Sequence, residues 1–426
     1  MKICVVAYKF GTAAEIGSHL GTYQYLANKL KYLSAQGHEV QVVAPWISFT
    51  KSGSRTVSGV KVTRTYPPLL PKIYLWPFNR LVRRFYIRAT QQAVKGVVNK
   101  IKPDVVYVWQ ARESGFAIAK IKKSLGCPFI FRQITTWHWH WQRRPKEIFE
   151  NNKVYKIFKS IGLGFLIDPV LVYLLDHRTQ KKYASYIYKK ADQVVFLSEA
   201  ALAEANQAGL PDITGRTKVL PIAVDHELFK PSIPRPKDLK TSGSKTVLYV
   251  GRLNFPEKGI GYLLEAVSLA KSKVPSIKLV IVGAGSPAQH KELEQRINQL
   301  NLKNHVLMVG KKPLTSLPAY QAAVDLAAIP SVWMEAFGAI TIQAMSCGTP
   351  VVTSDAGASP EINIDGQTGL VVKAADSQAL ARALIKLLSD SKLSKKMGEA
   401  ARARVLAMYT YKAVANKFLD LVREIK

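Results

Sequence analysis

Short apolar runs rich in β-branched residues recur along the whole chain, and stretches with helical periodicity separate them. Because successive residues of each run are apolar, a strand formed from it would bury both of its faces, which is typical of parallel sheets covered by helices on both sides. The sequence therefore predicts an α/β fold. The predicted strands are residues 3–7, 40–44, 105–108, 129–131 and 194–197 in the first half, and residues 247–250, 279–282, 306–309, 326–329 and 350–353 in the second.

A segment rich in Pro, Gly and Ser interrupts this pattern at residues 229–245. Such a composition indicates a linker between domains. A chain of 426 residues is also long enough for two domains of ordinary size, each able to bury its own core. We therefore predict an N-terminal, acceptor-side domain at residues 1–226 and a C-terminal domain at residues 227–409.

The composition argues against several classes of protein. A hydrophobic content of 48% is typical of a globular chain and rules out a disordered one. Uncharged apolar runs reach nowhere near the ~20 residues of a membrane span, and we interpret residues 3–7 as a buried strand instead of a signal peptide. The three cysteines, Cys4, Cys127 and Cys347, have neither disulfide nor metal-site spacing, which predicts a reducing, cytoplasmic compartment.

The chain is strongly basic, with a formal net charge of +32. The excess is uneven, since residues 1–220 carry 34 Lys and Arg against 12 Asp and Glu, whereas residues 221–426 carry 27 against 17. Such a field favours anionic partners, namely a phosphorylated substrate, an acidic lipid surface or nucleic acid. A basic proteome or a need for solubility would explain the same charge.

The segment at residues 330–353 predicts a loop, a helix and a buried strand in close succession. Glu335 lies in the loop, a helix follows at residues 337–347, and Gly348 ends it. A helix N-terminus offers unpaired N–H groups and a partial positive charge that suit a phosphate, and a carboxylate beside it suits sugar hydroxyls. The two together indicate a nucleotide-sugar site.

Two basic residues, Arg252 and Lys258, follow the predicted strand at residues 247–250. Arg binds phosphate as a fork and Lys binds it as a point charge, so the pair could clamp a diphosphate at this strand end. Solvated side chains of a surface loop are the alternative. Gly283 and Gly285 follow the next strand and would let the backbone approach a ligand closely, although glycine commonly ends strands.

These motifs resemble the donor site of the retaining glycosyltransferases of family 4. Glu335 fills the first acidic position of the family's signature, whereas Gln343 stands where the signature has a second Glu. The resemblance implies the GT-B architecture, in which two doubly wound Rossmann-like domains face one another across a cleft. It also implies that a last helix, at residues 410–426, packs back onto the N-terminal domain. The matching residues are Glu335, Phe337, Gly338, Ala344, Met345, residues 347–352, Pro360 and Glu361.

The same resemblance implies a role for each residue of the donor site. Glu335 would bind hydroxyls of the donor sugar, and Arg252 and Lys258 would bind the diphosphate and stabilise it as it leaves. Gln343 would contact the ribose with an acceptor oxygen but without the charge of the usual carboxylate. The other implied positions are Gly251, Phe337, Gly338 and Ala339 near the diphosphate, Gly283 and Gly285 near the diphosphate or the base, Gly310 beside the nucleobase, and Glu361 in a supporting role.

The first half of the chain matches the family less closely. Gly21 stands where the family has a Gly-Gly pair, and it would approach the diphosphate or the acceptor. Residues 137–141 read Trp-His-Trp-His-Trp, at a place where the family often has a His near the reacting centre. His138 is therefore a candidate for contact with the acceptor or sugar, with His140 as its alternate. A packed aromatic segment is the competing interpretation, and a metal site lacks a third ligand nearby.

Residues 142–190 combine basic and apolar stretches, and Asp168 with Pro169 interrupts any spanning helix. Amphipathic stretches flanked by cations lie well in an anionic membrane interface. A helical insertion packed on the domain, with its basic side chains in water, explains them equally well. The basic and aromatic residues upstream that add to this surface are Lys72, Tyr74, Trp76, Arg80, Arg83, Arg84, Phe85 and Arg88.

The sequence thus predicts a retaining, metal-independent glycosyltransferase that uses a nucleoside-diphosphate sugar, with a UDP sugar favoured. The acceptor would be a hydroxyl of a saccharide or lipid, and an anionic membrane surface is a candidate partner at the inner face of the membrane. We expect no bound cofactor, and no nucleic-acid partner because no recognition module is present. The alternatives are an epimerase or phosphorylase of the same fold and a non-enzymatic homologue that binds polyanions.

Overall fold

The computed structural model divides into two compact units, and each is described by itself. Unit 1 contains Met1–Leu197, Leu202–Leu220 and Ala415–Lys426, and unit 2 contains Ser198–Ala201 and Pro221–Val414. The residues that the structure describes are 1–12, 20–46, 55–66, 76–109, 113–135, 160–162 and 169–426.

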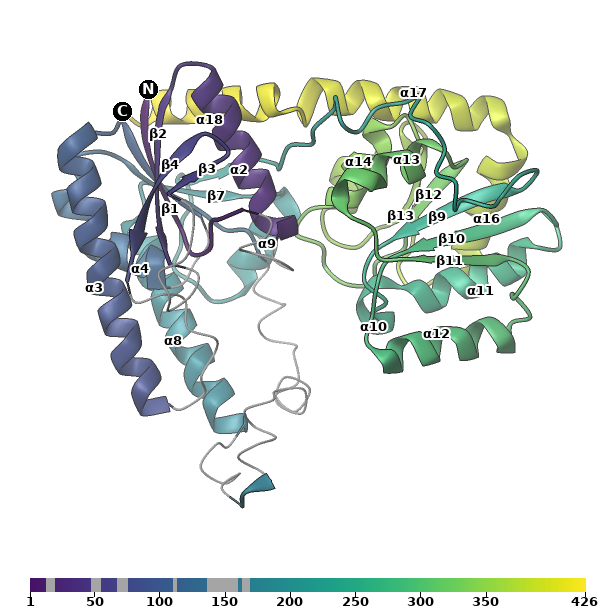
Figure 1. Cartoon of the computed structure of the whole chain (residues 1–426), viewed down its shortest axis with the longest axis horizontal. Helices are drawn as coiled ribbons and strands as arrows, with labels where there is room; N and C mark the ends of the chain where they lie inside the picture. Colours follow the sequence, from purple (N-terminus) through teal and green to yellow (C-terminus); the bar gives the residue numbers. More distant parts are fainter. Residues whose placement is uncertain (13–19, 47–54, 67–75, 110–112, 136–159, 163–168) are drawn as a thin grey trace. The chain divides into compact units, whose positions relative to one another are not determined.

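Unit 1 is built on an eight-stranded sheet with the order β3-β4-β2-β1-β5-β6-β7-β8 (Figure 1). All neighbouring strands are parallel except β3 and β4, which form an antiparallel pair at one edge. Strands β5, β6 and β7 are buried at every residue, as expected where helices cover both faces. The strands are β1 (Lys2–Ala7), β2 (Glu39–Pro45), β3 (Thr56–Val57), β4 (Val60–Thr65), β5 (Val105–Trp109), β6 (Phe129–Arg132), β7 (Gln193–Phe196) and β8 (Thr217–Val219).

Helices α3, α4 and α8 lie side by side against the sheet of unit 1 (Figure 1). The C-terminal part of α18 also belongs to this unit, and its Phe418 packs on Tyr107 of β5 with the ring centroids 4.8 Å apart. The helices, of which α9 and α18 each have their first residues in unit 2, are α2 (Leu20–Ala35), α3 (Trp76–Ile101), α4 (Glu113–Lys120), η2 (Lys122–Ser124), α8 (Pro169–Lys190), α9 (Glu199–Gln207) and α18 (Tyr411–Glu424).

Unit 2 contains a six-stranded, wholly parallel sheet with the order β11-β10-β9-β12-β13-β14. The chain adds strands on one side of β9 first and then crosses to the other side. The point where this order reverses therefore lies between β9 and β12, and ligands of open α/β sheets bind at such a point. The strands are β9 (Lys245–Val250), β10 (Ile277–Val282), β11 (Val306–Gly310), β12 (Leu326–Ile329), β13 (Val351–Ser354) and β14 (Gly369–Val372).

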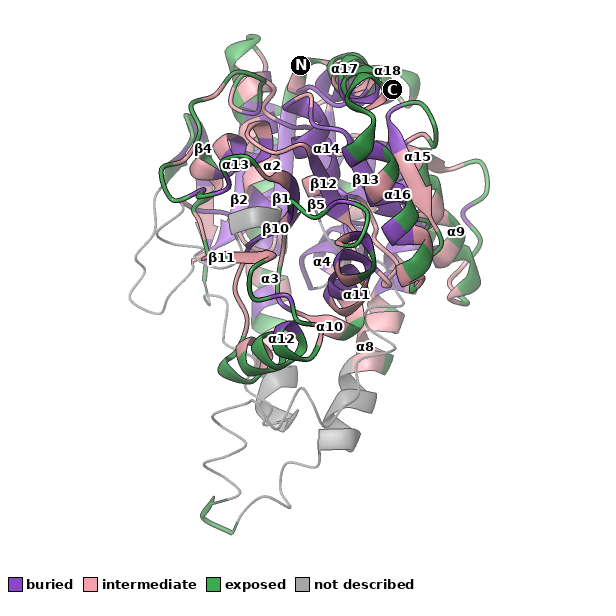
Figure 2. Cartoon of the chain, turned by 90° about the vertical axis from the view of Figure 1, so that its right-hand side faces the viewer, coloured by how far each residue is buried: buried purple, intermediate pink, exposed green. Residues whose placement is uncertain are grey.

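Two hydrophobic cores fill the two sides of this second sheet, and its four inner strands, β10, β9, β12 and β13, are mostly buried (Figure 2). One core contains residues of α11, α12 and α16, and the other contains residues of α13, α14 and α17. The helices are α10 (Phe255–Lys258), α11 (Ile260–Ala270), α12 (Pro287–Gln299), η4 (Leu314–Ser316), α13 (Leu317–Ala322), α14 (Ala339–Ser346), α15 (Ser359–Ile362), α16 (Ser377–Ser389) and α17 (Ser391–Met408).

Residues 229–245, which the composition assigns to a linker, belong to unit 2. Phe229 and Leu239 are buried in one of its cores, at 2% and 4% exposure. The Asp238 carboxylate accepts a hydrogen bond from the Tyr320 hydroxyl at 2.7 Å, and it pairs with the Lys312 ammonium at the same distance. The segment is thus anchored along its length despite its Pro and Gly content.

The predicted α/β class is confirmed, and each of the ten predicted strands coincides with an observed one. The main difference at the motif is the helix start, because α14 begins at Ala339 and not at residue 337. The strands that the sequence did not indicate lie at or beside sheet edges, namely β3, β4, β8 and β14. Among the described helices, none combines the length and apolar character needed to cross a membrane.

Candidate active site

Three glycines follow β9 and its neighbours at the carboxyl edge of the sheet in unit 2. The Gly251 N–H donates to Val282 O, and the Gly283 N–H donates to Gly310 O, both at 3.0 Å. A Cβ atom on Gly283 would collide with the carbonyl oxygen of Gly251, so a side chain is excluded there. The predicted glycines Gly251, Gly283 and Gly310 are therefore brought together as a continuous backbone surface.

Lys258 is the last residue of α10, a single helical turn directly after β9. The turn begins at Asn254, whose side chain accepts a hydrogen bond from the Glu257 N–H at 3.3 Å. Gly259 ends it and packs against the carbonyl group of Pro330, the first residue after β12. This contact brings the strand ends of β9 and β12 together and places Lys258 beside the loop that carries Glu335.

The Glu335 carboxylate accepts two hydrogen bonds on the same oxygen. Lys258 Nζ donates one of them and forms an ion pair with the carboxylate. Ser331 Oγ donates the other at 2.9 Å, and the carbonyl group of Ser331 in turn accepts a hydrogen bond from Ser354 Oγ at the end of β13. The side chains of Lys258 and Glu335 are 22% and 19% exposed, so the pair is mostly shielded but reachable from solvent.

The backbone around Glu335 is fixed by contacts from two other loops. Its carbonyl group accepts a hydrogen bond from the Ala358 N–H at 2.9 Å, and a Cβ atom on Gly357 would collide with the Glu335 backbone. The Val332 N–H donates to the carbonyl oxygen of Glu257 at 3.0 Å. The carboxylate therefore projects from a loop that is tied to the ends of β9 and β13.

Arg252 is placed differently from Lys258, although both follow β9. Its guanidinium pairs with the Glu257 carboxylate at 3.2 Å, and its side chain is 59% exposed. Its backbone is held by Tyr249, whose hydroxyl donates to Arg252 O at 2.7 Å. The two predicted phosphate ligands thus contact different carboxylates, and Arg252 is the one with the greater freedom to move toward a ligand.

The N-terminus of α14 follows Glu335 directly. Gly338 occupies the N-cap position and contributes no side-chain hydrogen bond to the first turn. A Cβ atom on Gly338 would meet Thr341 Oγ1 at 2.7 Å, so the backbone is tightly packed on its own helix. The Phe337 ring packs edge-on against Tyr409 at a centroid distance of 5.8 Å. The first N–H groups of the helix, beginning at Ala339, are therefore left without a side-chain cap.

Gln343 and Glu361 are the two other motif residues of unit 2. Gln343 is within α14 and only 1% exposed. The Glu361 carboxylate accepts hydrogen bonds from the backbone N–H groups of Glu199 at 2.9 Å and Ala200 at 2.7 Å, at the start of α9. The Arg404 guanidinium donates hydrogen bonds to the carbonyl oxygens of Glu361 and Ile362, at the end of α15, and so fixes the backbone of Glu361. Glu361 thus has a structural partner in the protein itself.

Three further predicted positions are Gly285, Gly21 and His138. Gly285 is in the loop after β10, where it packs against Leu253 and Gln289. Gly21 is in the first turn of α2, in unit 1. His138 and its alternate His140 lie outside the described residues. Within the described ranges no group of three or more His, Cys, Asp or Glu side chains is arranged to hold a metal ion.

Sequence reasoning missed Ser331 and the structural role of Glu257. Ser331 is 2% exposed and stands four residues before Glu335, immediately past the end of a strand. A polar residue at the carboxyl end of a buried parallel strand is a signal that could have found it. No comparable signal marked Glu257. Its carboxylate pairs with Arg252 and its carbonyl oxygen accepts a hydrogen bond from the Val332 N–H, and the second contact joins segments far apart in the sequence.

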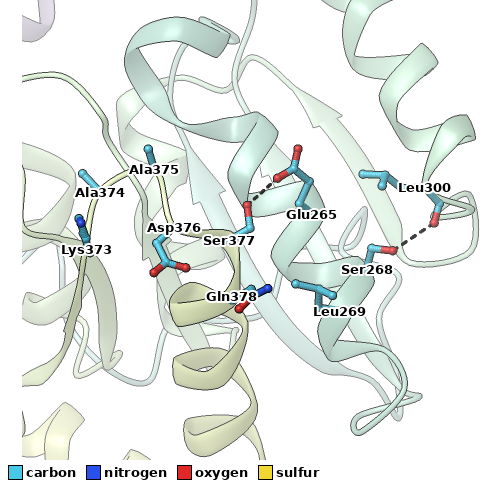
Figure 3. A pocket seen from close by; sticks show the side chains of 10 residues that line it. All are labelled: Glu265, Ser268, Leu269, Leu300, Lys373, Ala374, Ala375, Asp376, Ser377 and Gln378. Carbon is cyan, nitrogen blue, oxygen red and sulfur yellow. Dashed lines mark hydrogen bonds between the residues drawn. The ribbon is translucent and has the colours of Figure 1, made fainter.

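A separate hollow of about 600 Å³ opens elsewhere on unit 2 (Figure 3). It lies between α11, the loop after β14 and the start of α16, and Ser377 Oγ donates to the Glu265 carboxylate across it at 2.6 Å. Leu269 lines it and is 49% exposed. None of the predicted site residues borders this hollow, so the candidate site is the group around Lys258 and Glu335.

Comparison with known proteins identifies the family of the chain. The family model "Glycosyltransferase Family 4" matches residues 21–228, and the model "Glycosyl transferases group 1" matches residues 232–404. The chain belongs to glycosyltransferase family 4. The predicted family membership is therefore confirmed, and between them the two models cover most of the chain.

Curated relatives in this family include mannosyltransferases from mycobacteria. The chain is 34% identical to phosphatidyl-myo-inositol mannosyltransferase of Mycobacterium leprae over 42% of this chain and 47% of that protein. It is 29% identical to a GDP-mannose-dependent phosphatidylinositol monomannoside mannosyltransferase of Mycolicibacterium smegmatis, over 54% of this chain and 62% of that protein. The matches thus span about half the length of these relatives.

Solved structures agree along the whole chain. Sucrose-phosphate synthase from Thermosynechococcus elongatus superposes with a TM-score of 0.72 at 21% identity, covering 100% of this chain and 99% of that one. HepE from Anabaena, solved with UDP, gives a TM-score of 0.69 at 20% identity and covers 100% of both chains. At this identity the likeness concerns the fold, and it confirms the predicted GT-B architecture.

Proposed function

We propose that this protein is a glycosyltransferase that moves a sugar from a nucleoside-diphosphate sugar to a hydroxyl acceptor. The observation that carries the proposal is the Lys258–Glu335 pair at the point where the strand order of unit 2 reverses. A cation and a carboxylate there, followed by the uncapped N-terminus of α14, offer separate partners for a diphosphate and for sugar hydroxyls.

In this proposal the basic residues stabilise the departing diphosphate. Transfer passes through an oxocarbenium-like state in which negative charge grows on the leaving group, so fixed positive charge lowers the barrier. The Lys258 ammonium is held close to the sugar-binding carboxylate, and exposed Arg252 would reach the phosphates as a second cation. Glu335 would orient the donor sugar through its hydroxyls.

The stereochemical course is part of the proposal. We propose that the anomeric configuration is retained, through attack on the same face as the leaving group, with the donor phosphate accepting the acceptor proton. No carboxylate is assigned as a covalent nucleophile. We also propose that Arg252 and Lys258 take the role that a metal ion has in other transferases, so that chelation would leave the rate unchanged.

The donor we propose is a UDP sugar, and the acceptor a saccharide or lipid hydroxyl at a membrane surface. HepE has been solved with UDP, which supports this base, whereas the name of the relative from Mycolicibacterium smegmatis specifies GDP-mannose. The names of both mycobacterial relatives specify phosphatidylinositol-type acceptors, which supports a lipid-linked hydroxyl. GDP-mannose is therefore the donor against which UDP sugars must be compared.

Calorimetric titration with UDP, GDP and ADP and with their sugar conjugates tests the proposal. Binding of one nucleotide should weaken about tenfold or more in Arg252→Ala and Lys258→Ala, since each removes a charged hydrogen bond. Glu335→Gln should leave nucleotide binding in place and remove the additional affinity of the sugar conjugate. Lys303→Ala, at an exposed position of unit 2, is the matched control and should bind as the wild type does.

Failure of every nucleotide to bind the wild-type protein would reject the proposal and favour a non-enzymatic homologue. Conversion of the free nucleotide sugar without an acceptor would indicate an epimerase. With an acceptor in hand, the anomeric proton of the product in an NMR spectrum reports whether the configuration is retained, and a parallel reaction with a chelator tests the independence from metal ions.

A further inference from the structure

Helix α3 of unit 1 has an unusual composition. Its 26 residues contain six Lys or Arg and no Asp or Glu. It is also the longest helix of the described chain, at about 39 Å for a rise of about 1.5 Å per residue. Its basic residues are Arg80, Arg83, Arg84, Arg88, Lys95 and Lys100.

Most of the exposed side chains of α3 form one stripe along the helix. They recur every three or four residues, which places them on a single face. Residues on the opposite face, such as Tyr86 and Val94, are 5% and 0% exposed. The stripe consists of Leu81, Arg84, Phe85, Arg88, Gln92, Lys95 and Asn99.

Contacts with α4 fix the direction of this stripe. Arg83 pairs with the Glu113 carboxylate at 3.0 Å, and the carboxylate side chain is only 8% exposed. About two turns further along α3, Gln91 Nε2 donates to the carbonyl oxygen of Ala117 at 3.1 Å. These two contacts hold the buried face of α3 on α4, so the stripe points away from the unit.

Two large apolar side chains lie within the basic part of the stripe. Leu81 and Phe85 are 51% and 52% exposed, and they are one turn apart. Arg84 stands between them and Arg88 follows one turn later, and both are exposed. Exposed apolar side chains surrounded by cations are what an interfacial helix presents to an anionic bilayer.

The neighbouring helix α8 carries a second basic stripe. Arg178, Lys182 and Lys189 are exposed at positions that share one face of this helix. Since α3 and α8 flank α4 in one layer of unit 1, the two stripes belong to the same side of the unit (Figure 1). The cationic surface is therefore wider than one helix.

We propose that the exposed stripe of α3 docks unit 1 on the surface of an anionic lipid bilayer. Leu81 and Phe85 would enter the interface, while Arg84, Arg88 and Lys95 would contact the headgroups. The positive charge alone would also attract nucleic acid. The exposed apolar side chains of Leu81 and Phe85, however, would find no apolar contact on a phosphate backbone, whereas the acyl chains of a bilayer provide one. The proposal deepens the membrane-surface acceptor proposed above and rests on a different part of the molecule from the donor site.

Flotation of the whole chain with lipid vesicles tests the docking surface. Vesicles of phosphatidylcholine mixed with phosphatidylglycerol should bind the protein, and vesicles of phosphatidylcholine alone should not. Arg84→Gln with Arg88→Gln should lower the partition coefficient about 30-fold, because each cation near such a surface contributes about 1 kcal/mol. Leu81→Ser with Phe85→Ser should lower it about tenfold or more and remove the binding that persists at high salt.

Lys392→Gln with Lys396→Gln is the matched control, since it removes the same charge from exposed positions of α17 in unit 2. A loss equal to that of the α3 variants would mean diffuse attraction and would overturn the proposal. The surface would be assigned to polyanions in general if two results were found. Vesicle binding would be unchanged in Leu81→Ser with Phe85→Ser, and duplex DNA would compete equally well with vesicles for the wild type and for this variant. Circular dichroism and thermal unfolding show whether each variant is folded, and nucleotide titration of the same variants shows separately whether the donor site is affected.

Discussion

One carboxylate oxygen of Glu335 accepts hydrogen bonds from both Lys258 Nζ and Ser331 Oγ. A carboxylate that accepts two hydrogen bonds is held in one orientation, and its charge is balanced without a deep pocket. Ser331 is itself positioned through its carbonyl group by Ser354. Orientation of the proposed sugar ligand therefore depends on two serines at the ends of adjacent strands.

We predict that Ser331→Ala weakens the binding of the nucleotide sugar about tenfold, the effect of one hydrogen bond to a charged group. The affinity for the free nucleotide should stay the same, because Ser331 contacts the carboxylate and not the phosphate ligands. Calorimetry with both ligands measures the difference. A matched loss of both affinities would show that the serine supports the whole loop and not the carboxylate alone, and Ser354→Ala should act in the same direction.

A second prediction concerns Gly357, which has a φ of +59° and packs against the Glu335 backbone. An alanine there would add both left-handed strain and a collision, so Gly357→Ala should lower the free energy of unfolding by more than the ~1 kcal/mol that strain alone costs. Gly366→Ala is the control, since its φ is +71° and open space surrounds it. Denaturant titration of both variants separates the cost of the left-handed strain from the cost of the collision. An equal loss of unfolding free energy in the two variants would contradict the assigned collision.

At the residue scale, the sequence predicted Glu335, Arg252 and Lys258 but not their pairing. The ion pair joins residues 77 positions apart, and nothing local indicates it. The sequence predicts that Arg252 and Lys258 clamp a diphosphate together, but it does not indicate that Arg252 pairs with the Glu257 carboxylate. Long-range contacts of this kind arise from strand order, which the sequence leaves open until the fold is known.

At the scale of elements, buried strands were the easiest to predict and sheet edges the hardest. Strand β12 coincides with its prediction at both ends, because an apolar run buried on both faces has little alternative. The edge strand β14 begins with a glycine and is partly exposed, so its pattern is weak. The start of α14 differed by two residues because Phe337 and Gly338 continue the loop that presents Glu335.

The contact of α2 with α18 leads to a third prediction. Lys29 is 4% exposed, its Nζ lies 4.5 Å and 4.1 Å from the ring centroids of Tyr107 and Phe418, and no described residue accepts a hydrogen bond from it. Burial, and then the charge of nearby Arg132, hold the pKa of Lys29 well below its ordinary value of 10.5. The unfolded chain therefore binds one more proton than the folded chain between these two pKa values.

The free energy of unfolding should thus rise with pH across that window, as the cost of discharging Lys29 disappears. We predict that Lys29→Met stabilises the protein by about 1–3 kcal/mol at neutral pH and that the gain shrinks toward pH 10.5. Urea titrations at several pH values measure both effects. Lys31→Met changes an exposed residue of the same helix and should leave the pH profile unaltered, and a profile unaltered by Lys29→Met would contradict the assignment.

At the scale of the whole molecule, each unit contains a buried cysteine whose reactivity shows whether that unit is closed. Cys4 lies in β1 of unit 1 and Cys347 follows α14 in unit 2, and burial raises the pKa of each thiol to about 12. The thiolate is the reactive form, so we predict that neither reacts with Ellman's reagent in the folded protein at neutral pH. Both should react fully in denaturant, and fast labelling of either in native buffer would show that its unit opens locally.

The path of the chain has one more consequence, for protein engineering. Asp104 accepts a hydrogen bond from the Lys2 N–H at 2.7 Å and pairs with the Lys426 ammonium, so the two chain ends meet at one side chain. Unit 1 takes its last segment, Ala415–Lys426, from beyond unit 2. A circular permutant that joins residue 426 to residue 1 and opens the chain near residue 221 would make each unit continuous in sequence, apart from residues 198–201. The equivalents of unit 2 from relatives could then be exchanged for it at a single junction.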